Sequence, residues 1–179
     1  MKPIVEMSLG ELAAFVSSHL FKHGIEVVLS GGSCVVIHSN NQYVSFDLDF
    51  IEGFAPRKKL REALAEIGFF EEARYFKHPD TKFFLEFPRG PLAVGREPVK
   101  EVISLEFSTG SLKIISPTDC VKDRLAGFYH WDDGQCLQQA ILVAETQEID
   151  LEEIARWSKV EGKLREFRKI KKLLVREKP

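Results

Sequence analysis

The sequence SGGS at positions 30–33, followed by DLD at positions 47–49, says more about the fold of this 179-residue chain than any other stretch. Residues 25–29 before it are apolar and rich in β-branched side chains, which predicts a buried strand. The glycine pair breaks that strand into a turn, and residues 33–38 then suit a helix. Such a turn can aim backbone N–H groups at an anion. The sequence therefore predicts a phosphate-binding turn formed by three residues: Gly31, Gly32 and Ser33.

The aspartate pair lies in a second predicted strand, residues 43–51, where polar and apolar side chains alternate. A period of two places Asp47 and Asp49 on one face and the apolar residues Phe46, Leu48 and Phe50 on the other. Two neighbouring carboxylates repel each other unless a cation lies between them, and paired hard oxygen ligands suit Mg²⁺, which is commonly shared with substrate phosphates. The pair alone is also typical of a solvated strand face. Its position after a phosphate-binding turn favours a metal site.

The order of these motifs resembles the signature of the polymerase-beta-type nucleotidyltransferase superfamily, which joins Gly-Gly/Ser-Ser to Asp-x-Asp through a spacer of this length. The flanking sequence is similar to AbiEii-like and minimal nucleotidyltransferase-fold proteins of bacteria. The resemblance covers roughly residues 25–144. It implies an α/β nucleotidyltransferase fold, in which a mixed sheet is flanked by helices and followed by a helical C-terminal part. It also implies Mg²⁺ as cofactor and an NTP such as ATP as substrate.

A third carboxylate is expected, because two-metal phosphoryl transfer holds one ion on the nucleotide and another at the attacking oxygen. Glu86 and Glu106 are the candidates, and both lie in the middle of predicted strands among aromatic residues. Glu86 is preferred, since its strand is the first after the helix that follows the aspartate pair, which is similar to the position of the third acidic residue in related transferases. The family often has Asp there. Either glutamate is otherwise an outward-facing strand residue.

Lys122 is the predicted triphosphate contact. It lies one turn into a helix that begins at the sequence Ser-Pro-x-Asp (116–119), as a lysine does in the related proteins, and it flanks the apolar stripe of that helix. A point charge on a flexible stem suits phosphate neutralisation. The other interpretation is a surface lysine paired with an acid. The histidines His19, His23, His38 and His78 show no metal-ligand spacing, and His130 is interpreted as structural.

Composition favours one compact domain over residues 1–179, with a catalytic core over about 1–130 and a helical subdomain over about 131–179. The net charge of −2 gives no general attraction for nucleic acid. Three unevenly spaced cysteines indicate neither a disulfide framework nor a zinc site. We expect a cytoplasmic protein, because the sequence shows no secretion signal and no apolar run long enough to span a membrane.

The expected reaction is the transfer of a nucleoside monophosphate from an NTP to an acceptor hydroxyl on RNA, a protein or a small molecule. A helix expected over about 161–176 could guide RNA, or simply face solvent, through one basic face that comprises Arg165, Arg168, Lys169, Lys172 and Arg176. The alternative function is that of a weak or inactive nucleotidyltransferase-fold protein that binds a partner in a bacterial toxin–antitoxin or defence pair. Intact Asp47 and Asp49 argue against simple decay of activity.

Overall fold

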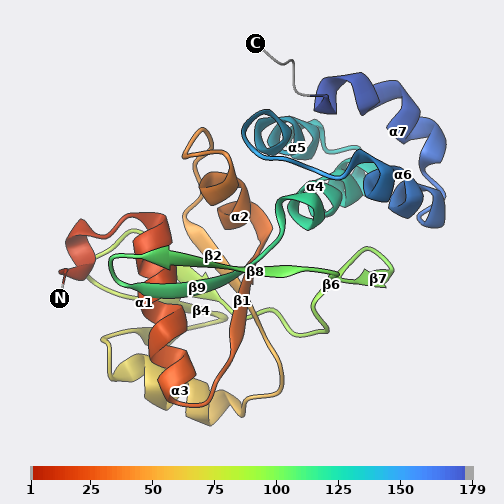
Figure 1. Ribbon diagram of the computed structural model, residues 1–179. Coiled ribbons are helices and arrows are strands. Elements are labelled where there is room, and N and C mark those ends of the chain that lie inside the picture. The colour runs from red at the N-terminus through yellow and green to blue at the C-terminus, as the bar shows by residue number, and fades with distance from the viewer. Residues whose placement is uncertain (1, 176–179) are drawn as a thin grey trace. The chain divides into compact units, whose positions relative to one another are not determined.

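The computed structural model describes residues 2–175, which form two compact units (Figure 1). The first, called the sheet unit, comprises residues 2–33, 45–92 and 102–115. The second, called the helical unit, comprises residues 34–44, 93–101 and 116–175. The expectation of one domain over the whole chain stays a prediction.

A seven-stranded mixed sheet organises the sheet unit. Its strands are β1 (Val27–Ser30), β2 (Asp47–Glu52), β3 (Phe70–Glu72), β4 (Tyr75–Lys77), β5 (Phe84–Glu86), β8 (Val102–Phe107) and β9 (Gly110–Ile115). They are arranged in the order β3-β4-β5-β2-β1-β9-β8. The pairs β1–β9 and β2–β5 are parallel and the remaining neighbours are antiparallel. The predicted mixed sheet is therefore confirmed.

Helices flank this sheet. Helix α1 (Leu9–Lys22) begins with the predicted capping box, in which Ser8 and Glu11 each accept a hydrogen bond from the other's backbone N–H. Its apolar side packs against β1, β8 and β9, and helix α3 (Arg57–Ala65) contacts α1 and β3. Helix α2 (Gly31–His38) begins directly after β1. The α/β class expected from the sequence is what the structure shows.

Strand β2 carries the alternation that the sequence predicts. Leu48 and Phe50 are fully buried, whereas the two aspartates on the other face are partly exposed. The predicted start of the strand was wrong, because β2 begins at Asp47 and residues 39–46 form turns and loops. Phe46, predicted to share the buried face, is 45% exposed. The carboxylates thus lie at the very start of the strand.

The apolar and aromatic pattern of residues 69–76 predicts one strand, but the structure has a hairpin there. Strands β3 and β4 pair in antiparallel fashion, and the chain reverses at Ala73, whose φ is 56°. No glycine or asparagine marks this turn, so the pattern does not reveal it. The pattern of residues 99–107 likewise predicts a strand from Val99, whereas β8 begins at Val102.

The helical unit contains the later part of α2, a small antiparallel pair and the C-terminal helices. These further elements are β6 (Ala93–Val94), β7 (Glu97–Pro98), α4 (Pro117–Trp131), α5 (Gly134–Thr146), α6 (Leu151–Val160), α7 (Leu164–Ile170) and a 3-10 helix (Lys171–Leu174). Helix α4 has the predicted Ser116 cap. Fully buried Trp157 packs on Tyr129 and donates a hydrogen bond to the Val94 carbonyl oxygen. Within residues 2–175, no helix is long and apolar enough to cross a membrane.

The single helix expected over about 161–176 is broken. Helix α6 ends at Val160, Gly162 has a φ of 73°, and α7 begins at Leu164. Gly162, with its positive φ, separates α6 from α7. The expected helix is also shorter at its other end, because α7 gives way at Lys171 to a 3-10 helix that contains Lys172. Four members of the basic stripe are exposed or partly exposed: Arg165, Arg168, Lys169 and Lys172. Arg176 lies outside the described residues.

A buried ion network joins α4 to α6. The Lys122 Nζ lies 2.6 Å from an Asp119 carboxylate oxygen and 3.2 Å from one of Glu153, and its side chain is only 1% exposed. The second Asp119 oxygen accepts the backbone N–H groups of Lys100 and Glu101. Hydrogen bonds from Arg156, with those from Lys100 and Lys122, hold the pKa of Glu153 well below its ordinary value. Lys122 is therefore tightly held in a structural network.

Lys122→Ala should lower the free energy of unfolding by about 3–5 kcal/mol, because it leaves the Asp119 charge buried without its partner. The matched control is Lys100→Ala, which also removes an ion pair to Glu153 but from a side chain 51% exposed, and it should cost less than about 1 kcal/mol. Urea unfolding followed by tryptophan fluorescence measures both, since both tryptophans lie in the helical unit. Equal losses for the two variants would contradict the proposed role of burial.

Candidate functional site

The pairing register brings two predicted site residues, Asp49 and Glu86, together on adjacent strands. Ser30 of β1 lies opposite Asp49 of β2, and Asp49 in turn lies beside Glu86 of the parallel strand β5. Residues paired in this way present their side chains on the same face of a sheet, and Asp47, two residues earlier, shares that face. The three carboxylates predicted to bind metal therefore stand on one face of the sheet unit.

Glu106 lies elsewhere in the same sheet. It lies on β8, the edge strand, where it pairs with Ser111 of β9, and its side chain is open to solvent. Strands β1 and β9 separate β8 from β2, so two strands stand between Glu106 and the aspartate pair. Of the two sequence candidates for a third acid, the topology places only Glu86 next to Asp49.

Gly31 lets the turn after β1 approach the Asp49 carboxylate. A Cβ atom at Gly31 would lie 2.1 Å from the Asp49 Oδ2, and the Gly31 φ of 69° is one that side chains rarely tolerate. Only a residue without a side chain fits both conditions. The predicted phosphate-binding turn and the predicted metal-binding strand thus meet at this contact.

The N-terminus of α2 opens at this turn. The Ser33 side chain is buried and its hydroxyl donates to the Ser30 carbonyl oxygen at 3.1 Å, so it fastens the turn. The Ser30 hydroxyl donates to the Asp49 carbonyl oxygen at 3.3 Å. N–H groups in the first turn of a helix have no acceptor within the helix and suit an anion. In the turn, Gly31, Gly32 and Ser33 would therefore bind phosphate through the backbone rather than through the serine hydroxyl.

The carboxylates of Asp47 and Glu86 each have a hydrogen-bonding or charged neighbour. The Ser45 hydroxyl donates to Asp47 Oδ1, and the Arg74 guanidinium lies 3.3 Å from Glu86 Oε1. A hydrogen bond to the Tyr75 hydroxyl, together with the charges of Glu86 and Asp49, raises the pKa of Arg74 above its ordinary value. Arg74 therefore adds a permanent positive charge beside the acidic face.

Arg74 was not expected from the sequence. It follows Ala73 at the turn of the β3–β4 hairpin, and that segment was interpreted as one continuous strand. The guanidinium also lies 4.9 Å from the centre of the Tyr75 ring. Because Tyr75 pairs with Glu86 across β4 and β5, this hairpin carries the cation to the acidic face. An arginine that follows two glutamates in the sequence does not by itself indicate a residue of a functional site.

The oxygens of Asp47, Asp49 and Glu86 do not all come within 4.8 Å of one another in the described part of the chain. The register thus lines up three ligand positions along a face and does not form a single closed cage. Two ions in a phosphoryl-transfer centre lie about 3.5–4 Å apart, so carboxylates that are not gathered around one point suit a two-ion site. Hard carboxylate oxygens are the donors that Mg²⁺ requires.

Lys122 belongs to the helical unit, where it is buried between Asp119 and Glu153. In this structure two carboxylates neutralise its charge. Its assignment as a triphosphate contact stays a prediction, and the burial itself was not expected from a residue that flanks the apolar stripe of α4.

Gly31→Ala tests the contact between turn and strand. It should lower the free energy of unfolding by more than about 1 kcal/mol, because the methyl group meets Asp49 and the φ is unfavourable. Gly53→Ala is the control: it lies in the same unit, no described heavy atom lies within 4 Å of the place where its methyl group would be, and its change should stay within about 0.5 kcal/mol. Urea unfolding followed by circular dichroism gives both values. A neutral Gly31→Ala variant would show that the turn can move away.

Comparison with known proteins gives fold neighbours only. No family model and no curated protein matches this sequence. An antigenic nucleotidyltransferase-like protein from Paracoccidioides brasiliensis matches with a TM-score of 0.64 and 13% identity over 94% of each chain. The solution structure of the antibiotic-resistance factor ANT(2'')-Ia matches with a TM-score of 0.51 and 14% identity, over 93% of this chain and 94% of that one. Its crystal structure with adenylyl-2''-tobramycin also has a TM-score of 0.51, at 13% identity, over 90% of this chain and 97% of that one. The chain therefore has the fold of nucleotidyltransferase-like proteins.

Proposed function

We propose that this protein transfers a nucleoside monophosphate from an NTP to an acceptor hydroxyl and releases pyrophosphate. The observation that carries the proposal is the register Ser30–Asp49–Glu86, which sets two carboxylates, with Asp47 on the same face of β2, on the strands beside the N-terminus of α2. A phosphate-binding helix end next to a row of carboxylates suits a nucleotide with its divalent cations. The nucleotidyltransferase-like fold is consistent with this chemistry.

Each part of the site has a distinct role in this proposal. The backbone N–H groups of Gly31, Gly32 and Ser33 bind the phosphates, while Asp47 and Asp49 hold Mg²⁺, which neutralises the phosphate charge. Glu86 binds the attacking hydroxyl. Positioning and charge neutralisation then supply most of the catalysis, as phosphoryl transfer requires little covalent help.

The proposed reaction requires no reactant other than the NTP and the acceptor hydroxyl. The acceptor oxygen forms a bond to the α-phosphorus, the bond from that phosphorus to the bridging oxygen breaks, and pyrophosphate leaves. The hydroxyl proton passes to the Glu86 carboxylate. Arg74, 3.3 Å from the same carboxylate, keeps Glu86 oriented toward the acidic face. Its guanidinium also offsets negative charge that gathers there.

A small molecule is the acceptor that we favour among RNA, a protein and a small molecule. One fold neighbour is described in complex with adenylyl-2''-tobramycin, a small molecule that carries an adenylyl group. The basic stripe considered for RNA is shorter than expected, because α7 ends at Ile170 and Lys172 lies in the following 3-10 helix. ATP is accordingly the first nucleotide to test.

Glu86→Gln and Glu106→Gln form a matched pair of variants on one sheet. Glu86→Gln should lower the rate of transfer by more than about 100-fold, because it removes a ligand and proton acceptor, whereas Glu106→Gln should retain the wild-type rate. Combined Asp47→Asn and Asp49→Asn should abolish Mg²⁺-dependent transfer. The assay incubates the protein with each α-labelled NTP, Mg²⁺ and separated small-molecule, RNA and protein fractions.

The fraction that becomes labelled identifies the acceptor class. Both glutamate variants should stay folded, since the Glu86–Arg74 pair is partly exposed and contributes little stability. Equal losses in the two variants would remove Glu86 from the site. Failure of the wild-type protein to label any fraction would instead favour the interaction protein of a toxin–antitoxin or defence pair.

A further inference from the structure

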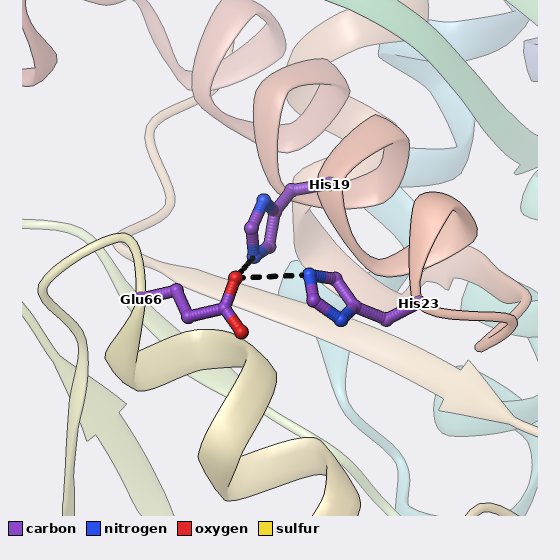
Figure 2. A group of neighbouring side chains, drawn as sticks. All are labelled: His19, His23 and Glu66. Carbon is purple, nitrogen blue, oxygen red and sulfur yellow. Dashed lines mark ion pairs between the residues drawn. The ribbon is translucent and has the colours of Figure 1, made fainter.

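A second group of metal-ligating side chains lies in the sheet unit, away from the aspartate strand: His19, His23 and Glu66 (Figure 2). The histidines were expected to lack ligand spacing, and for two of them that expectation was wrong. His19 lies in the last turns of α1 and His23 caps its end, so they are four residues apart on one side of the helix. Glu66 caps the end of α3 and points toward both rings (Figure 2).

The three side chains already have nearly the spacing of metal ligands. One Glu66 oxygen, Oε2, lies 3.1 Å from His23 Nε2 and 3.9 Å from His19 Nε2. The three ligating atoms all lie within 4.8 Å of one another, and no other group of three His, Cys, Asp or Glu residues in the described ranges does so. Tetrahedral zinc with bonds of about 2.0–2.1 Å places its ligand atoms about 3.3 Å apart. Small side-chain rotations therefore suffice to close the site.

The surroundings also favour a cation. The group lies where α1 and α3 both end, and a helix C-terminus carries partial negative charge. Two imidazolium rings with centres 4.7 Å apart would repel each other, and a single carboxylate neutralises only one of them. One dication bound by two neutral rings and the carboxylate avoids that repulsion. The competing contact is the Ala63 carbonyl oxygen, which lies 2.8 Å from His19 Nε2 and accepts its proton.

We propose that His19, His23 and Glu66 bind a zinc-type transition-metal ion that ties the end of α1 to the end of α3. Two imidazole nitrogens with one carboxylate oxygen suit Zn²⁺, whereas Mg²⁺ prefers oxygen ligands throughout. A water molecule would complete the tetrahedron. To bind through Nε2, His19 must carry its proton on Nδ1, so the metal replaces the contact with the Ala63 carbonyl. The role is structural and independent of the proposed transfer reaction.

The test titrates Zn²⁺ into protein freed of metal by a chelator, in the Asp47→Asn, Asp49→Asn background so that the carboxylate face does not contribute. Calorimetry should show one ion per chain, and Co²⁺ should give the visible absorption of a tetrahedral site. His19→Gln, His23→Gln and Glu66→Gln should each weaken binding by more than about tenfold, since loss of even an outer partner commonly costs about 10- to 100-fold. Zn²⁺ should also raise the melting temperature of the parent protein.

Two variants serve as matched controls. Glu62→Gln removes an exposed carboxylate one turn earlier on the same helix as Glu66, and His130→Gln removes a histidine whose Nε2 lies 3.2 Å from Glu161 without a second histidine in the pair. Both should bind Zn²⁺ like the parent. Should a histidine variant fail to fold, Glu66→Gln decides the test, because that side chain is 57% exposed. Unchanged Zn²⁺ affinity in a folded Glu66 or histidine variant, or the absence of binding by the parent, overturns the proposal.

Discussion

The close approach of the Gly31 backbone to the Asp49 carboxylate makes the candidate site possible. Because a Cβ atom at Gly31 would lie 2.1 Å from the Asp49 Oδ2, the carboxylate can keep its position beside the paired residues Ser30 and Asp49 only if the turn has no side chain there. That pairing fixes Asp49, and the parallel pairing of β2 with β5 then fixes Glu86. One steric condition thus sets the position of the helix end and of two carboxylates.

The same arrangement concentrates negative charge, and the sheet unit offsets it locally. The Ser45 hydroxyl binds Asp47, the Arg74 guanidinium binds Glu86, and the first turn of α2 brings the positive end of a helix dipole near Asp49. Each of these groups partners one carboxylate, and none of them carries the double charge of a divalent cation. The acidic face is therefore suited to receive metal together with phosphate.

Local patterns in the sequence predicted a strand followed by a helix around the glycine pair and the alternation of Leu48 and Phe50 with the two aspartates. The helix begins at Gly31 rather than at Ser33, so the glycines belong to its first turn. The local patterns failed where the outcome depends on distant partners. Glu86 and Glu106 have similar neighbours in sequence, and only the order of strands separates them. The burial of Lys122 depends on Glu153, 31 residues later. The position of Glu66 beside His19 and His23 depends on how α3 packs against α1. The spacing of the two histidines, four residues apart on one helix, is by contrast a local feature of the sequence.

Electron–nuclear double resonance on the protein with bound Mn²⁺ and ATP, with the aspartate carboxyl carbons labelled with ¹³C, tests whether the acidic face binds metal and nucleotide together. We predict that one manganese ion couples both to phosphorus of the nucleotide and to aspartate carbon, and that the carbon coupling disappears in the Asp47→Asn, Asp49→Asn variant. Manganese that couples to phosphorus but to no aspartate carbon, or that keeps its carbon coupling in the variant, would contradict the assignment of this face as the nucleotide and metal site.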